Sequence, residues 1–393
     1  MRIIKSSKVE KLEWFIVLVI YFYQFLLGEF SPLSNMMLVL LYIQQWTKQS
    51  QGLLKYNTVL LIVASSLLGY SIIQGNSVVY AVRFAIILIL VMSSYSWKID
   101  YNFYLKCLYV VSLIQVLGLI ILEAYMFSTS YEEYAFIRNE IVKANEIGDI
   151  FLYNDIYYKL ELKGTSLLAF VYMLSYAVDL FPMNHTRLLR SLYLVGLILA
   201  GNFAYQLTII IFHFVWHFIS VGSNPKILVR KILTLSLFLL FIGGLLWGFV
   251  SDTVKDKEEG GSLPTRYDQA KVLYKDATRT SSIFLFGSGV GHTINEKTSI
   301  RDYRDAVYYE VQSLYIANQL GLIGFTILII TNIILAFRVF KERRLIIVYS
   351  LYVLYASTNP YIWDTTQIIV IASLICAFCK IKNYIIVKSF VRS

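Results

Sequence analysis

The sequence predicts an all-α polytopic integral membrane protein with about twelve transmembrane helices. The chain has 393 residues, of which 58% are hydrophobic, and its mean hydropathy is +0.63. A soluble domain of this size does not need so much apolar surface. Apolar stretches of roughly the length that crosses a bilayer recur from one end of the chain to the other. We therefore expect residues 1–393 to form a single transmembrane domain.

The first apolar stretch follows a basic start, as the apolar core of a signal peptide would. Ser31-Pro32 leads straight into the next apolar stretch, with no small-residue cleavage site between the two. We therefore expect a retained first helix. The expected membrane segments are, in chain order, 14–30, 33–46, 54–74, 77–97, 103–125, 163–181, 188–201, 203–221, 231–250, 311–336, 345–357 and 364–380.

The distribution of lysine and arginine predicts how these segments are oriented. Basic residues gather at every alternate boundary, whereas turns such as Gly75-Asn76 and Gly201-Asn202 carry none. Short loops rich in Lys and Arg stay in the cytoplasm, so both termini are expected there. These loops account for most of the net charge of +10, which therefore does not indicate a nucleic-acid partner.

Two long hydrophilic segments, 126–162 and 251–309, then fall on the outer side of the membrane. Long loops in a compact membrane bundle are usually functional or disordered. In the second, Ser262 is a suitable N-cap and Pro264 suits the first turn of a helix. One face of that helix would carry Tyr267, Ala270, Tyr274 and Ala277. We expect a short amphipathic helix that lies on the outer membrane surface.

Arg83 lies inside the fourth segment, in the stretch AVRFAIILIL. A buried arginine is costly in lipid, so we expect it either to bind an anion inside the bundle or to reach the outer headgroups. A phosphate is the natural anion at that depth, because a guanidinium grips it with two hydrogen bonds. The second outer segment adds four candidates for binding pyrophosphate or sugar: Arg266, Arg279, Arg301 and Arg304.

Each of these four arginines has an alternative role as part of a solvated loop of mixed charge. Arg266 stands out, because the positive end of the expected helix would lie beside it and favour an anion. Glu310, at the start of the tenth segment, is either an interfacial carboxylate paired with Arg301 or Arg304, or a general base. Gln312 and Gln319 follow it on the same helix as candidate substrate contacts.

Other polar residues carry weaker signals. His292 is a second candidate for acid–base catalysis. It follows Gly287–Gly291, which is either a flexible turn that approaches the membrane closely or a small nest of backbone amides for an anion. Asp364 lies at a segment end and is expected to be interfacial, and the CxxC pair Cys376 and Cys379 is expected to pack in the core. No metal-ligand cluster or cofactor motif is evident, so we expect a metal-independent reaction without a cofactor.

Three stretches resemble the signature region of the O-antigen polymerase and ligase superfamily (Wzy-type and WaaL-type enzymes). They are RYDQA at 266–270, FGSGVG at 286–291 and EVQSLYIANQLGLIG at 310–324. In that superfamily an arginine opens an outer-loop helix, a GxG turn follows, and a segment of the form HNxYL…ElGLiG starts the next helix. The layout of membrane segments around one large, late outer loop agrees with the resemblance.

By position, Arg266 matches the loop arginine of that superfamily, and Gln319 stands at the glutamate of ElG. Glu310 stands where ligase-type members have a histidine, and this departure points to the polymerase branch. The resemblance implies a glycosyltransferase of the bacterial inner membrane. It would polymerise undecaprenyl-pyrophosphate-linked oligosaccharide repeats into O-antigen or capsular polysaccharide. Arg83, Arg266 and Arg279 would hold the pyrophosphate, and Glu310 would take the proton of the acceptor hydroxyl.

The same resemblance implies which partners to expect. They are undecaprenyl-pyrophosphate-linked oligosaccharides and membrane lipid, with a chain-length regulator and a flippase as protein partners. Two alternatives remain open from the sequence. One is a transporter or flippase of the same lipid-linked sugars, which needs a polar path through both leaflets and usually internal repeats. The other is a ligase that attaches finished chains to another carrier.

Overall fold

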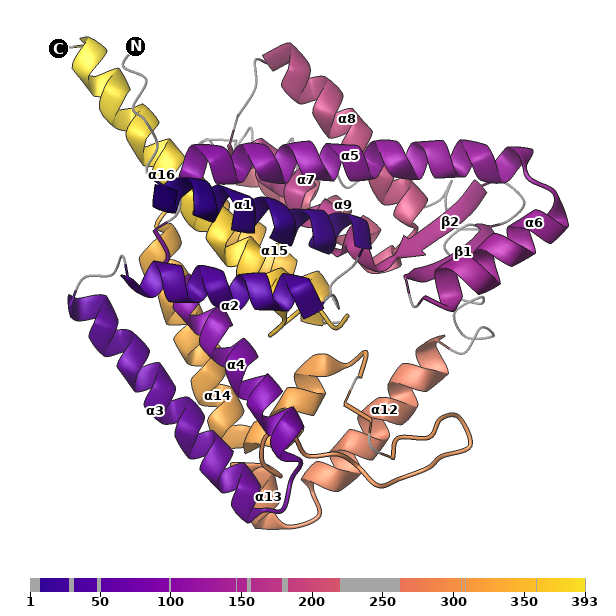
Figure 1. The fold of residues 1–393 in the computed structure, drawn as a ribbon, viewed down its shortest axis with the longest axis vertical. Helices are drawn as coiled ribbons and strands as arrows, with labels where there is room; N and C mark the ends of the chain where they lie inside the picture. The colour runs from indigo at the N-terminus through magenta and orange to yellow at the C-terminus, as the bar shows by residue number, and fades with distance from the viewer. Residues whose placement is uncertain are drawn as a thin grey trace.

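The structure, a computed structural model, is mostly helical (Figure 1). It describes residues 8–27, 32–47, 51–98, 100–145, 147–153, 157–178, 183–219, 262–304, 306–307, 309–357 and 359–392. The longer helices are α1 (Lys8–Phe22), α2 (Pro32–Thr47), α3 (Gln51–Ile73), α4 (Val78–Ser94), α5 (Tyr101–Ser128), α7 (Leu168–Ala177), α8 (Met183–Ala200), α9 (Phe203–Ile219), α12 (Ser262–Ala277), α14 (Gln312–Phe340), α15 (Arg343–Ser357) and α16 (Thr365–Arg392). Short π-helical and 3₁₀ turns follow α1, at Tyr23–Leu27, and precede α7, at Lys163–Leu167.

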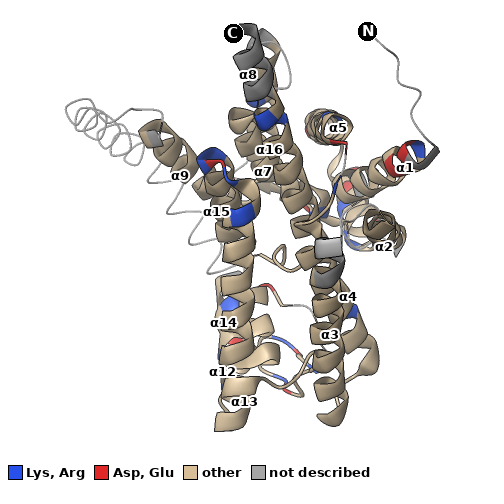
Figure 2. Ribbon diagram, turned by 90° about the vertical axis from the view of Figure 1, so that its left-hand side faces the viewer, with Lys and Arg blue, Asp and Glu red and all other residues tan. Residues whose placement is uncertain are grey.

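Four of the described helices are long and apolar enough to cross a membrane, judged by length and composition. They are Tyr56–Ile73 within α3, the whole of α5, the whole of α14, and Thr365–Asn383 within α16. The described residues also include two shorter apolar helices, Val78–Ser94 and Phe203–Phe218. Figure 2 shows long uncharged stretches along α3 and α14. The membrane character is therefore supported, whereas the expected count of about twelve spans is not confirmed, and segment 231–250 lies outside the described residues.

The segment 126–162, which was expected on the outer side, contains strands, so the expectation of an all-α chain is wrong at this point. After α5 come a short helix, α6 (Tyr131–Phe136), a π-helical stretch at Ile137–Lys143, and an antiparallel hairpin of β1 (Gly148–Tyr153) and β2 (Tyr157–Leu162). Ile150 faces Leu160 across the hairpin, and neither side chain is exposed. Alternating apolar side chains that are buried on one face are what a half-covered strand pair requires.

In the segment 251–309 a helix begins at Ser262, as predicted, but its buried face differs from the expected one. Tyr267 and Tyr274 are 75% and 70% exposed. The face that packs toward α14 instead carries Gln269, Val272, Leu273 and Asp276. The polar residues on this face find partners on the loop and on α14, described below, so a pattern of apolar residues alone points to the wrong side of α12.

A small second core packs α12 and the residues that follow it against the start of α14. It consists of Val272, Leu273, Ile294, Tyr303, Tyr309 and Tyr315. The rings of Tyr303 and Tyr309 are stacked with centroids 5.8 Å apart, and Tyr309 lies 4.6 Å from Tyr315. The main core lies elsewhere, around α7, where residues Leu168–Ser175 are all buried. The segment 262–309 is thus held by its own aromatic cluster, and Val290 joins it to the main core.

Helix α14 is broken near its start. Gly321 has φ 68° and ψ 174°, well outside helical values. A break leaves carbonyl groups before it without their partners within the helix. The residues that satisfy these carbonyls form part of the candidate site.

Candidate functional site

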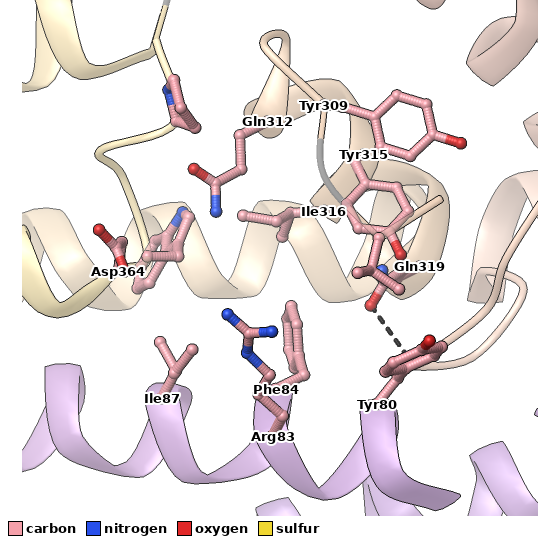
Figure 3. A pocket seen from close by; sticks show the side chains of 14 residues that line it. Tyr80, Arg83, Phe84, Ile87, Tyr309, Gln312, Tyr315, Ile316, Gln319 and Asp364 are labelled. Atoms are coloured by element: carbon pink, nitrogen blue, oxygen red, sulfur yellow. Dashed lines mark hydrogen bonds between the residues drawn. The ribbon is translucent and has the colours of Figure 1, made fainter. Parts of the chain in front are cut away.

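A cavity of about 110 Å³ lies between α4, the first turns of α14 and the segment that leads into α16 (Figure 3). We call it the polar cavity, because Arg83, Gln312, Gln319 and Asp364 line it. The complete lining is Tyr80, Arg83, Phe84, Ile87, Gly291, Val307, Tyr309, Gln312, Tyr315, Ile316, Gln319, Pro360, Trp363 and Asp364. Three residues predicted from the sequence, Arg83, Gln312 and Gln319, therefore meet in one place although they come from distant parts of the chain.

A second cavity, of about 330 Å³, lies on the other side of Arg83. We call it the apolar cavity, because α2 and α4 line it mainly with aliphatic side chains. Its lining is Asn35, Met36, Val39, Val79, Val82, Arg83, Ile86, Ile87, Leu90, Asp364 and Thr365. Arg83, Ile87 and Asp364 line both cavities. Two side chains of opposite charge, Arg83 and Asp364, therefore line both cavities.

Arg83 projects from α4 into the space that Gln312 and Asp364 face (Figure 3). Among the described residues, no ion pair neutralises it. An arginine at the wall of a cavity without a carboxylate partner is positioned to bind an anion, because its fork of donors fits phosphate oxygens. Arg83 is exposed, so its position fits either of the two roles expected for it, binding of an anion or contact with lipid headgroups.

The glycine-rich turn closes the break in α14. The backbone N–H groups of Ser288 and Gly289 donate to the carbonyls of Asn318 and Gln319, each at 3.0 Å, and the N–H of Gly291 donates to the Gln319 side chain at 3.2 Å. A Cβ atom at Gly287 would lie 2.2 Å from the Gln319 carbonyl oxygen. A close approach to the membrane was one expectation for this turn; the close approach that the structure shows is to α14. These amides serve the helix break and are not free to form an anion nest.

Asp276, on the buried face of α12, gathers a network of hydrogen bonds around the same turn. Its Oδ2 accepts from Asn318 Nδ2 at 2.9 Å and lies 3.0 Å from His292 Nε2. The other ring nitrogen of His292 lies 3.3 Å from Asn76 Oδ1, in the turn between α3 and α4. Burial raises the pKa of Asp276, but the hydrogen bonds from His292 and Asn318 outweigh it and hold the pKa below its usual value.

His292 therefore has both ring nitrogens engaged by protein side chains, and it does not line either cavity. Its geometry is that of a brace that joins the α3–α4 turn to α12. The catalytic role expected for it from the sequence finds no support in this position.

Arg266 and Glu310 form an ion pair that joins α12 to the residues just before α14. Arg266 Nε donates to Glu310 Oε2 at 2.7 Å, and both side chains are 28% exposed. Gln269, fully buried, accepts from the backbone N–H of Glu310 at 2.9 Å. One of the two roles expected for Glu310 was an interfacial carboxylate paired with Arg301 or Arg304; its partner is instead Arg266. Neither member of the pair lines the cavities, although Tyr309 and Gln312 on either side of it in the chain do.

The remaining arginines are spread over the loop surface. Arg279 is half-exposed and its Nε lies 3.4 Å from Asp276 Oδ1. Arg304 is paired with its near neighbour Asp302. Arg301 is exposed. None of these three lines either cavity, so they match the alternative that the sequence left open, a solvated loop of mixed charge.

Sequence reasoning missed the roles of Asp276, Asn318 and Asp364. Asp276 and Asn318 gave no local signal, because their partners lie far along the chain. Asp364 looked like an ordinary interfacial residue, yet it lines both cavities. The preceding residue, Trp363, has φ 55°. Hydrophobic periodicity and charge patterns do not reveal such a backbone conformation.

Comparison of the chain with protein-family models, with curated proteins and with solved structures finds no match.

Proposed function

We propose that the chain is a membrane glycosyltransferase that polymerises lipid-linked oligosaccharide repeats. The donor would be a growing glycan on undecaprenyl pyrophosphate, and a single lipid-linked repeat would supply the attacking hydroxyl. One observation carries the proposal: Arg83, without an ion-pair partner among the described residues, lines two neighbouring cavities, of which the second is walled mainly by aliphatic side chains of α2 and α4.

An amphipathic substrate accounts for that arrangement better than a soluble one. A lipid-linked pyrophosphate has an anionic headgroup joined to an isoprenoid chain. The headgroup would lie against Arg83, with the first sugar near Gln312 and Gln319, and the first isoprene units would lie among Met36, Val39 and neighbouring aliphatic side chains. Apolar burial of the tail and charge-assisted hydrogen bonds to the phosphate would then act together.

The reaction asks little covalent chemistry of the protein. Both substrates are anchored in the membrane, so holding them side by side supplies much of the rate. Negative charge develops on the pyrophosphate as it leaves, and a positioned guanidinium stabilises that charge more in the transition state than in the ground state. In this proposal Arg83 is the group that does so, while Arg266 and Glu310 hold the outer segment in place beside the cavity.

The proposal includes a location in the bacterial inner membrane, about twelve spans, cytoplasmic termini and an outer position for α12. Figure 1 is in keeping with this orientation, because α1 begins and α16 ends on the side of the molecule away from α6 and α12. The proposed partners are lipid-linked oligosaccharides and membrane lipid, with a chain-length regulator and a flippase in the same pathway.

The test compares surface glycans and lipid-linked glycans from a deletion strain and from the same strain carrying the gene. The proposal expects single repeats on the lipid carrier at the outer surface of the deletion strain, and long ladders in the complemented strain. Single repeats trapped on the inner side would contradict it and indicate a flippase. Long lipid-linked chains that are not transferred to a surface carrier would contradict it and indicate a ligase.

A further inference from the structure

We propose that Asp364 is the general base of this site, the residue that takes the proton from the attacking hydroxyl. The inference rests on the proposed function and assigns a role that the sequence gave to Glu310. Asp364 lines the polar and the apolar cavity together with Arg83, whereas Glu310 lines neither.

The carboxylates of Glu310 and Asp364 differ in their charged partners. Glu310 receives a 2.7 Å hydrogen bond from Arg266, so a positive charge lies against the oxygen that would accept a proton. No ion pair among the described residues neutralises Asp364. In Figure 3 it faces the same space as the Arg83 guanidinium and Gln312. For in-line attack, the acceptor hydroxyl has to lie across the cavity from the anion site. Asp364 places a carboxylate at that position.

The backbone before Asp364 is strained. Trp363 has φ 55°, which is a rare value for a bulky side chain and costs free energy. Its N–H donates to the buried Gln367 side chain at 2.7 Å, and its ring lines the polar cavity. Such strain persists where the surroundings impose it, often at functional sites. Here the strained residue immediately precedes Asp364.

The Asp364 side chain is also held by its neighbours. Thr366 Oγ1 donates to Oδ2 at 3.1 Å and Thr365 Oγ1 donates to Oδ1 at 3.4 Å. Thr366 in turn receives a 3.2 Å hydrogen bond from Gln24, which is fully buried. Threonine hydroxyls orient a carboxylate without adding a charge, so they fix the position of the Asp364 side chain.

The proposed step balances as follows. The hydroxyl oxygen of the acceptor sugar forms a bond to the anomeric carbon of the donor while its O–H bond breaks and the proton moves to an Asp364 oxygen. The bond between that carbon and the pyrophosphate oxygen breaks, and its electron pair leaves with undecaprenyl pyrophosphate beside Arg83. The proton is released to water before the next turnover.

The test uses Asp364→Asn in the full-length protein. Asparagine keeps the size of the side chain and one acceptor oxygen for the threonine hydroxyls, but it cannot take the proton. We expect elongation of lipid-linked repeats, extracted from the deletion strain, to fall by about 100-fold or more. We expect undecaprenyl pyrophosphate to bind at least as tightly as to the wild type, because a negative charge near the anion is removed. Asp100→Asn is the matched control, because Asp100 caps the start of α5 and lines neither cavity.

A second variant separates chemistry from folding. Asp364→Gly opens space in the cavity wall, and added formate supplies a carboxylate there. We expect formate to restore part of the elongation activity of Asp364→Gly. We expect formate to give no such increase with Asp100→Gly or with Arg83→Ala. Full activity of Asp364→Asn would overturn the inference. So would a loss of activity accompanied by loss of undecaprenyl pyrophosphate binding and no recovery by formate. If the wild type elongates lipid-linked repeats, the proposed function stands in either of these cases. If the wild type does not elongate them, the proposed function itself is contradicted.

Discussion

Arg266 donates a 2.7 Å hydrogen bond to Glu310 and so ties the first turns of α12 to the residue two places before α14. Both side chains are partly exposed, so we expect a coupling of about 0.5–1 kcal/mol in a double-mutant cycle with Arg266→Ala and Glu310→Gln. The measurement is unfolding in detergent by the same denaturant series for all four proteins. The reversed pair, Arg266→Glu with Glu310→Arg, should recover part of the loss, and strictly additive single effects would contradict the contact.

The glycine turn gives a prediction about stability. Gly287→Ala should lower the melting temperature strongly, because its Cβ would lie 2.2 Å from the Gln319 carbonyl oxygen and its φ is 83°. Gly69→Ala is the matched control, since nothing lies within 4 Å of a Cβ there and alanine is favoured in a helix. The control should be neutral or stabilising. Equal effects of the two substitutions would argue against the docked turn.

The pKa of Asp276 predicts a dependence of stability on acid. Because hydrogen bonds from His292 and Asn318 lower the folded-state pKa against the effect of burial, the charged form stabilises the fold above the unfolded pKa of about 4. That contribution is lost as the pH falls through the lower folded-state pKa. Asp276→Asn should therefore be less stable than the wild type at pH 7, by about 1–3 kcal/mol. The difference should vanish in strong acid, and a constant difference across the range would contradict the network.

Arg83 gives a prediction about binding. Arg83→Ala should weaken binding of undecaprenyl pyrophosphate by about 10–100-fold, the amount expected for charged hydrogen bonds to a phosphate. Arg83→Lys should fall between the two, because it keeps the charge but loses the planar fork. Titration in detergent micelles measures this. Arg279→Ala is the control, since Arg279 lines neither cavity, and an equal loss in both variants would show that binding is a general surface effect.

The helices of this chain could be predicted from the sequence, because apolar runs and basic boundaries are local properties. The expected segments outside 231–250 overlap described helices, and the start of α12 at Ser262 was predicted. The hairpin at Gly148–Leu162 was missed because one buried pair, Ile150 and Leu160, carries too little alternation to stand out beside charged neighbours. The buried face of α12 was assigned wrongly because Gln269 and Asp276 are buried as polar residues with distant partners.

The candidate site, too, could be predicted from the sequence only in part. Arg83, Gln312 and Gln319 were identified because each is unusual in its apolar surroundings, and they line one cavity. That Glu310 would meet Arg266, and that Asp364 would face Arg83, depends on how helices pack. Contacts of this kind join residues 44 and more positions apart, and no local periodicity carries that information.

The most direct measurement is elongation by the purified protein in proteoliposomes that contain only lipid-linked single repeats from the deletion strain. The account predicts a ladder of longer lipid-linked glycans, release of undecaprenyl pyrophosphate in step with each new bond, and loss of both with Arg83→Ala. Movement of single repeats across the bilayer with no new glycosidic bond would contradict it.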